Sequence, residues 1–89
     1  MEITFDPAKD ASNIIKHGVS LALASRLDWD SAMIWPDTRH AYGEVRYSAL
    51  GLLGERVYFI AFMDRADCRR IISLRKANDR EVRDYAAND

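Results

Sequence analysis

Val57-Tyr58-Phe59-Ile60-Ala61-Phe62 is a continuous run of apolar, β-forming residues, and it decides how the rest of the chain can be arranged. A run of this kind, without polar alternation, predicts a central strand that is covered on both faces. Turn signals flank it at Leu53-Gly54-Glu55 and at Arg65-Ala66-Asp67. Both connections are short and therefore favour antiparallel hairpins. The run is expected to be the middle strand of an antiparallel meander.

The two neighbouring strands are predicted on either side of this run. From Gly43 the pattern changes to a period of two, which is typical of a strand with two different faces. One face carries Glu44, Arg46, Ser48 and Leu50, and the other carries Val45, Tyr47, Ala49 and Gly51. Residues Arg69 to Leu74 form the third strand of the predicted meander.

Helices are predicted before and after the meander. Asp6-Pro7 is a helix start and Lys16-His17-Gly18 a helix end, which predicts a helix over 7–17. A second helix is expected at about 21–27, capped by Ser20, with Leu21, Ala24 and Leu27 facing inward. Asn78 and Glu81 form a capping box for a last helix at about 79–87.

Two short strands complete the expected order of elements. Residues 3–5 are a possible first strand, and residues 32–35 a short edge strand ended by Pro36. The prediction is therefore an α+β fold in a single domain over residues 1–89. It has two N-terminal helices, an antiparallel β-meander of three to four strands and a C-terminal helix.

The charges are balanced in sum and uneven along the chain. The 89 residues carry 13 basic and 14 acidic side chains, a net charge of −1, which argues against coating nucleic acid by bulk charge. Residues 1–37 have a net charge of −3, and residues 38–89 a net charge of +2. Ten of the basic residues are arginines, whose planar fork suits bidentate contact with phosphate or carboxylate. A local basic site in the second half is expected.

Several function classes find no support in the sequence. The chain has no apolar run of about 18 residues and no basic, apolar leader at its start, so a cytoplasmic protein without membrane contact is expected. Cys68 is the lone cysteine, and the histidines His17 and His40 stand in no zinc-binding spacing. We therefore expect no metal and no cofactor.

The strand order places some arginines together. In an up-down-up meander, the start of one strand lies near the end of the next, so Arg46 and Arg65 are expected at the same end of the sheet. Arg75 is expected at the opposite end. We therefore interpret Arg46 and Arg65 as the pair that holds a phosphodiester, because clustered guanidinium groups can stabilise the charge that develops on it during cleavage. Glu44 or His40 could take the proton from a ribose 2′-OH.

Other polar residues extend this hypothesis, and a second interpretation stands beside it. The predicted RNA-binding side chains are Arg69, Arg70, Lys76 and Tyr85, with Arg69 and Arg70 pointing to different faces of the sheet. In the alternative, the arginines form ion pairs with Glu44, Asp64 and Asp67 on a solvated sheet face. The domain would then be a non-catalytic module whose arginines bind an acidic segment of a partner protein.

Three groups of residues resemble the BrnT family of toxins. The first is Phe5-Asp6-Pro7-x-Lys9 with Asn13-x-x-Lys16-His17-Gly18-Val19-Ser20. The second is Arg39-His40 with Gly43-Glu44-x-Arg46 and Ala49-Leu50-Gly51, and the third is Arg70-Ile71-Ile72-Ser73-x-Arg75-Lys76-Ala77 with Glu81 and Tyr85. The pieces occur in order over nearly the whole chain. The sequence departs from the pattern at Phe62-Met63-Asp64-Arg65, where the family often has Tyr-Thr, and at Arg69, where an aliphatic residue is more usual.

The resemblance implies a function and partners. BrnT-like proteins are toxins of type II toxin–antitoxin systems, with a RelE-like fold and metal-independent ribonuclease activity that blocks translation. The resemblance implies a BrnA-like antitoxin in a toxin–antitoxin heterotetramer, with operon DNA bound only through that antitoxin. Glu44, Arg46, Arg65 and Arg75 match polar positions of the family's sheet, and we expect them at the RNA site.

Overall fold

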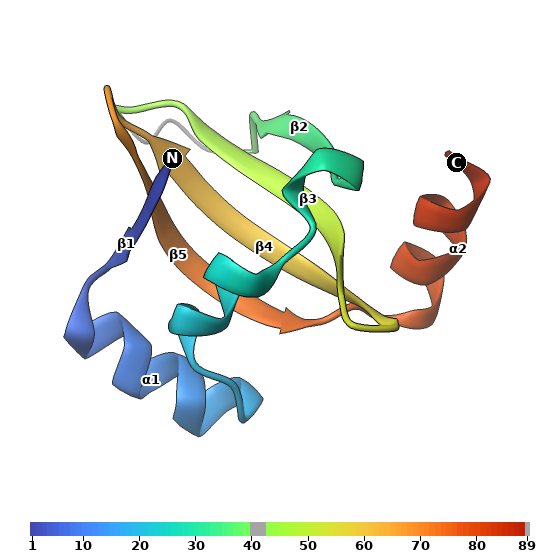
Figure 1. Cartoon of the computed structure of the whole chain (residues 1–89), viewed down its shortest axis with the longest axis horizontal. Helices are drawn as coiled ribbons and strands as arrows, with labels where there is room; N and C mark the ends of the chain where they lie inside the picture. Colours follow the sequence, from blue (N-terminus) through green and yellow to red (C-terminus); the bar gives the residue numbers. More distant parts are fainter. Residues whose placement is uncertain (40–42, 89) are drawn as a thin grey trace.

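The computed structural model describes residues 1–39 and 43–88, and residues 40–42 and 89 lie outside this description. The elements in chain order are β1 (Glu2–Phe5), α1 (Pro7–His17), the 3-10 segments η1 (Leu21–Arg26) and η2 (Trp29–Ser31), β2 (Met33–Asp37), β3 (Arg46–Leu53), β4 (Arg56–Asp64), β5 (Cys68–Lys76) and α2 (Asp79–Ala87). The strands form one five-stranded sheet in the order β1-β5-β4-β3-β2 (Figure 1). Within the described ranges, no helix is long and apolar enough to cross a membrane.

The sheet confirms the α+β class and the meander, and it corrects the number and direction of the strands. β4 contains the apolar run and lies in the middle of the sheet, antiparallel to β3 and β5. The sheet is mixed, however, because β1 pairs in parallel with β5, from Glu2 opposite Cys68 to Phe5 opposite Ile71. β1 and β5 are more than 60 residues apart and are not joined by a turn. The local pattern of residues therefore could not reveal that they pair.

The second predicted helix is a 3-10 segment. Leu21, Ala24 and Leu27 are buried, as predicted. Their spacing of three residues matches the three residues per turn of a 3-10 helix better than an α-helix. Ser20 caps η1 by accepting from the backbone N–H of Ala22, and the Asp10 carboxylate accepts from the Leu21 N–H at 2.7 Å. The Asp10 side chain thus joins η1 to α1.

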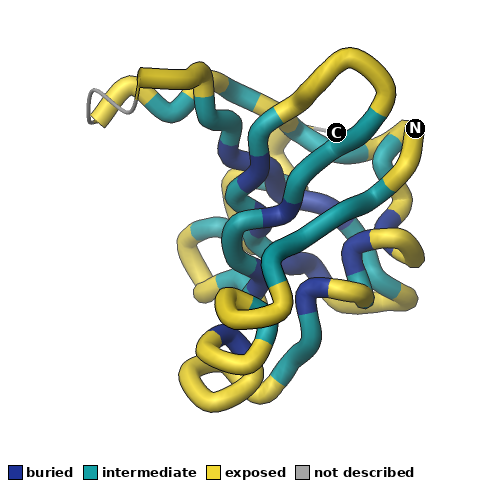
Figure 2. Tube along the Cα trace, turned by 90° about the vertical axis from the view of Figure 1, so that its left-hand side faces the viewer, coloured by how far each residue is buried: buried dark blue, intermediate teal, exposed yellow. Residues whose placement is uncertain are grey.

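The hydrophobic core lies between η1 and one face of the sheet, which we call the core face. Leu21, Ala24 and Leu27 pack there against a cluster that includes Ile60, Phe62 and Leu74. A Cβ atom at Gly51 would lie 3.0 Å from the Leu27 side chain, so any other residue there would require Leu27 to shift. Figure 2 shows the buried residues in the middle of the fold and the exposed ones at its turns and outer segments.

α1 closes the edge of the sheet beyond the end of β1. The buried side-chain amide of Asn13 donates to the Leu74 carbonyl at 2.8 Å and accepts from the Leu74 N–H at 3.2 Å. It also donates to the Val19 carbonyl at 2.9 Å. The amide thus replaces a strand partner for β5. Gly18 ends the helix in a left-handed conformation, with φ 73°, and both helix-end predictions for α1 are confirmed.

The opposite face of the sheet carries most of the polar residues, and we call it the α2 face because α2 packs at one end of it. A bulge in β5 determines which residues lie there. The pairing shifts between Ala61 and Phe62, and Ile72 is the extra residue, so Arg75 lies on the α2 face while Arg69 lies on the core face. On β4, Tyr58, Ile60 and Phe62 are buried on the core face, whereas Phe59, Ala61 and Met63 on the α2 face are only half-buried. The predicted cover on both faces is therefore partial.

Candidate functional site

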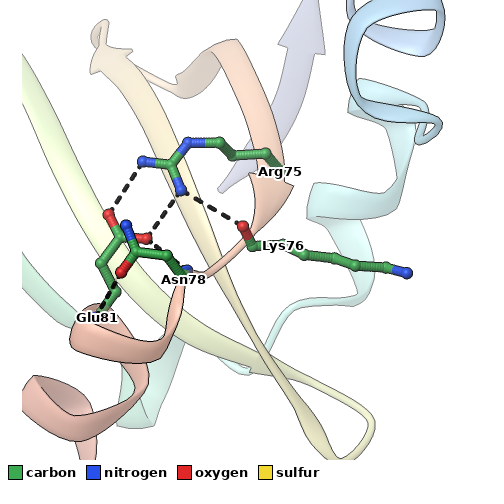
Figure 3. Close-up of polar contacts among 4 residues, drawn as sticks. All are labelled: Arg75, Lys76, Asn78 and Glu81. Carbon is green, nitrogen blue, oxygen red and sulfur yellow. Dashed lines mark hydrogen bonds and ion pairs between the residues drawn. The ribbon is translucent and has the colours of Figure 1, made fainter.

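Arg75 and Glu81 form a bidentate ion pair where β5 meets α2 (Figure 3). Arg75 Nη1 donates to Glu81 Oε1 at 2.8 Å and Nη2 donates to Oε2 at 3.0 Å. The guanidinium carbon also lies 4.3 Å from the centre of the Phe59 ring. The Arg75 guanidinium is therefore fixed in position by a carboxylate on one side and an aromatic face on the other.

The capping box of α2 positions Glu81. Its carboxylate accepts from the Asn78 N–H at 2.9 Å, and its own N–H donates to Asn78 Oδ1 at 2.8 Å. The hydrogen bond from Arg75 is the main cause that lowers the pKa of Glu81, and the Asn78 N–H acts in the same direction, while burial opposes both. The sequence predicted this residue as a helix cap only. The ion pair with Arg75 also requires the chain to turn back between β5 and α2, so that Glu81 faces Arg75.

A pocket of about 320 Å³ opens beside this ion pair on the α2 face. Its lining residues come from β2 and the residues after it, from β3, β4 and β5, and from α2: Trp35, Pro36, Asp37, Thr38, Arg39, Ser48, Phe59, Arg75 and Glu81. The Trp35 and Phe59 rings meet edge to face, with centroids 6.4 Å apart. The Asp37 carboxylate accepts from Arg39 Nε and Nη2 at 2.9 Å each. The pocket thus combines arginines, carboxylates, two hydroxyls and two aromatic rings.

A second group of arginines lies at the other end of the α2 face. Arg46 begins β3 opposite Asp37 of β2, and Arg70 lies opposite Met63. Arg65 follows β4, and its Nη2 atom lies 3.5 Å from Glu44 Oε1. Arg70 pairs with Met63 and Arg75 pairs with Phe59, four residues apart on β4, which is a distance of about 13 Å at the usual rise per residue. Arg46 and Arg65 therefore lie at one end and Arg75 at the other, which is the expected arrangement.

Three predicted RNA contacts lie away from the pocket. Arg69 is on the core face, where Asp64 accepts from it at 2.7 and 2.9 Å and its guanidinium lies against both the Trp29 and the Phe62 rings. Lys76 is opposite Tyr58, and its side chain points away from Arg75 (Figure 3). The hydroxyl of Tyr85 donates to the Ser31 carbonyl at 3.2 Å. His40 lies outside the described residues.

Sequence reasoning missed most of the pocket. The strand register brings three of its residues to the same face of the sheet. Trp35 pairs with Ser48, and Phe59 pairs with Leu50, which lies on the same side of β3 as Ser48. The alternation of β3 contained this signal for Ser48. In the continuous apolar run of β4, nothing distinguishes Phe59 from its neighbours. In the parts of the chain that the structure describes, no group of three or more histidine, cysteine or acidic side chains could hold a metal ion.

The mixed sheet with its flanking helices defines a small α+β domain. The pocket on its α2 face carries arginine and carboxylate groups that are suited to binding and cleaving a phosphodiester. The family model for the ribonuclease toxin BrnT of type II toxin–antitoxin systems matches residues 5–81, so the chain belongs to this family. The crystal structure of the Brucella abortus ribonuclease toxin BrnT is similar, with a TM-score of 0.72 and 25% sequence identity. The match covers 89% of this chain and 99% of that one. No curated protein matches the sequence.

Proposed function

We propose that this chain is the toxin of a type II toxin–antitoxin pair and cleaves RNA at the pocket on the α2 face. Membership of the BrnT ribonuclease toxin family supports the class of reaction. The observation that carries the site is the Arg75–Glu81 ion pair, which lies in the pocket beside the Trp35 and Phe59 rings. Aromatic rings that face a groove can stack on bases, and a bidentate arginine can hold a phosphate between them.

The proposed reaction is an attack of the ribose 2′-oxygen on the adjacent phosphorus. The Glu81 carboxylate accepts the 2′-OH proton as the new O–P bond forms, and the bond to the 5′-oxygen breaks. Arg75 stabilises the negative charge that accumulates on the phosphoryl oxygens. Glu81, like any unperturbed glutamate, is ionised at neutral pH and can accept a proton, although the hydrogen bond from Arg75 lowers its pKa and makes it a weaker base. His40 is the proposed acid that returns a proton to the 5′-oxygen.

The second group of arginines is proposed to hold the RNA beyond the scissile phosphate. Arg46, Arg65 and Arg70 lie toward the other end of the α2 face, and Arg70 pairs four residues of β4, or about 13 Å, away from the residue opposite Arg75. Glu44 lies beside Arg65 and is proposed to orient its guanidinium, a change from the proton-transfer role that the sequence suggested. Arg69, Lys76 and Tyr85 are not part of the proposed site.

The remaining features of the proposal concern metal and partners. We infer catalysis without a metal ion, because an acid, a base and an arginine are sufficient for this reaction. A BrnA-like antitoxin in a heterotetramer is the proposed partner, with operon DNA bound through the antitoxin. The cytoplasm, where the RNA is translated, is the proposed site of action.

Expression in a bacterium without the antitoxin gene tests the proposal. We expect growth arrest, and we expect the purified protein to cleave single-stranded RNA equally well in EDTA. Glu81→Gln retains the acceptor oxygen for Arg75 and removes the base, so the cleavage rate should fall by about 10²–10⁴-fold. Unimpaired growth together with intact RNA would contradict the proposal, and so would a need for Mg²⁺ in the case of the metal-free mechanism.

The alternative of a non-catalytic module has one specific observation in its favour. Arg65 and Arg75 each already contact a carboxylate of the chain itself, which is also how they would bind an acidic segment of a partner. In that case the protein would bind the partner with Arg75 intact and show no cleavage under any condition. Cleavage by the wild type that is lost in Glu81→Gln would exclude this alternative.

A further inference from the structure

A second pocket, of about 190 Å³, lies between α1 and β5 and takes no part in the proposed cleavage. Its lining residues are Lys9, Ser12, Asn13, Lys16, His17, Ile72 and Ser73. Lys9 and Lys16 are seven residues apart, so two turns of α1 place them on the same side of the helix, about 10 Å apart along its axis. No carboxylate is among these lining residues.

The nearby acidic residues are engaged elsewhere. Asp6 caps the start of α1 through the Ala8 N–H at 2.8 Å. The Asp10 carboxylate accepts from Ser20 Oγ at 2.9 Å and from the Leu21 N–H at 2.7 Å. The first 37 residues are acidic in sum, yet two of their three basic side chains line this pocket. Lys9 and Lys16 therefore form a local positive site that the net charge of this part of the chain conceals.

The pocket and the proposed cleavage site are both lined by residues of β5. Ser73 lines the pocket and lies opposite Ala61, on the same face of β5 as Arg75 two residues later. The distance along the strand from Ser73 to Arg75 is about 7 Å. The bulge at Ile72 places Ser73, at the rim of this pocket, on the same face of β5 as Arg75.

We propose that this pocket binds a backbone phosphate of the RNA strand that leaves the cleavage site across β5. The proposal rests on the proposed function and names where the substrate continues. Ammonium groups and serine hydroxyls suit a phosphate, because both donate hydrogen bonds and the lysines supply the charge. Lys9 and Lys16 flank the phosphate, and Ser12 and Ser73 lie between the helix and the strand.

The double variant Lys9→Gln/Lys16→Gln tests the site with a fluorescent single-stranded RNA of about 12 nucleotides. Glutamine has a helix propensity close to that of lysine, so α1 should persist. The slope of log affinity against log salt concentration should become shallower by about 0.7 for each lysine that contacts a phosphate. KM for cleavage of this 12-nucleotide RNA should rise about tenfold. Cleavage of dinucleoside monophosphates should be unchanged, because they are too short to reach the pocket.

The matched control removes the same charge elsewhere. Arg26 and Arg56 are exposed and lie outside both pockets, so Arg26→Gln/Arg56→Gln should leave the salt slope and KM as in the wild type. An equal loss in the control, or an unchanged slope in the lysine variant, would overturn the proposal. It would also be overturned if the lysine variant bound RNA normally and lost only affinity for the antitoxin, because the pocket would then hold an acidic protein segment.

The two proposals fail separately. If the wild type binds RNA without cleaving it and the lysine variant still shows the shallower slope, the phosphate pocket stands and the proposed cleavage does not. If the wild type cleaves dinucleoside monophosphates and the lysine variant handles long RNA normally, the cleavage site stands and the pocket is overturned.

Discussion

Arg69 and Arg75 have similar partners at opposite ends of the same strand, and the comparison separates support from function. Each guanidinium makes a bidentate ion pair with a carboxylate, and each lies about 4.4 Å from the centre of a phenylalanine ring. Arg69 lies on the core face against the Trp29 and Phe62 rings, with 17% of its side chain exposed, and it borders a pocket of about 310 Å³ there. Arg75 is 33% exposed and borders the pocket on the α2 face. The chemistry is shared, and the two guanidinium groups border different pockets on opposite faces of the sheet.

The largest difference is expected in cleavage. Arg75→Ala should lower kcat/KM for RNA by about 10²–10³-fold, because it removes a donor to the charge that forms in the transition state. Arg69→Ala should change kcat/KM per folded molecule by less than about threefold, since Arg69 lies on the other face of the sheet. The measurement is steady-state cleavage, normalised to the folded fraction. An equal loss in both variants would return Arg69 to the RNA site, where the sequence placed it.

Stability should show the reverse order. Arg69→Ala removes two hydrogen bonds and the contacts with both rings, and it leaves Asp64 without that partner. We expect a loss of about 2 kcal/mol in the free energy of unfolding, against about 1 kcal/mol for the more exposed Arg75→Ala. Urea unfolding monitored by tryptophan fluorescence measures both. A larger loss for Arg75→Ala would reverse the distinction between the two pairs.

The smallest effect concerns acid sensitivity at the Arg75 pair. The pKa of Glu81 is lowered in the folded state, so its contribution to stability is present above the pKa of an unfolded glutamate, about 4.3, and is lost as the pH falls through the lower folded value. Urea midpoints between pH 6 and pH 3 should therefore fall more steeply in the wild type than in Glu81→Gln. Parallel curves for the two proteins would mean that this carboxyl is not held ionised by Arg75.

Local signals predicted the elements whose determinants are close in sequence. The apolar run of β4, the turns beside it, and the caps Asp6, Gly18 and Asn78 are each readable within a few residues. The parallel pairing of β1 with β5 and the bulge at Ile72 depend on contacts between distant segments, so the sequence pattern contained no sign of them.

The site was predicted in the same uneven way. The positions of Arg46 and Arg75 at opposite ends of the sheet followed from strand direction, whereas Arg75 was expected at the RNA site because of the resemblance to the BrnT family. Glu81 was recognised as a cap and its contact with Arg75 was missed, because that contact depends on how α2 folds back against the sheet. The place of the Phe59 ring in the pocket was missed, because Phe59 lies in an apolar run whose two faces cannot be distinguished until the pairing partners are known.

The Asn13 amide has a consequence for solubility. A strand edge with free N–H and C=O groups can pair with a strand of another molecule. The pairing of β1 with β5 ends at Ile71, and the part of β5 beyond it contains the apolar residues Ile72 and Leu74. By occupying both groups of Leu74, one side chain of α1 ends the sheet where a further strand could otherwise add. Any strand that joined the sheet there would first have to displace the helix. α1 therefore protects this edge against aggregation as well as covering the fold.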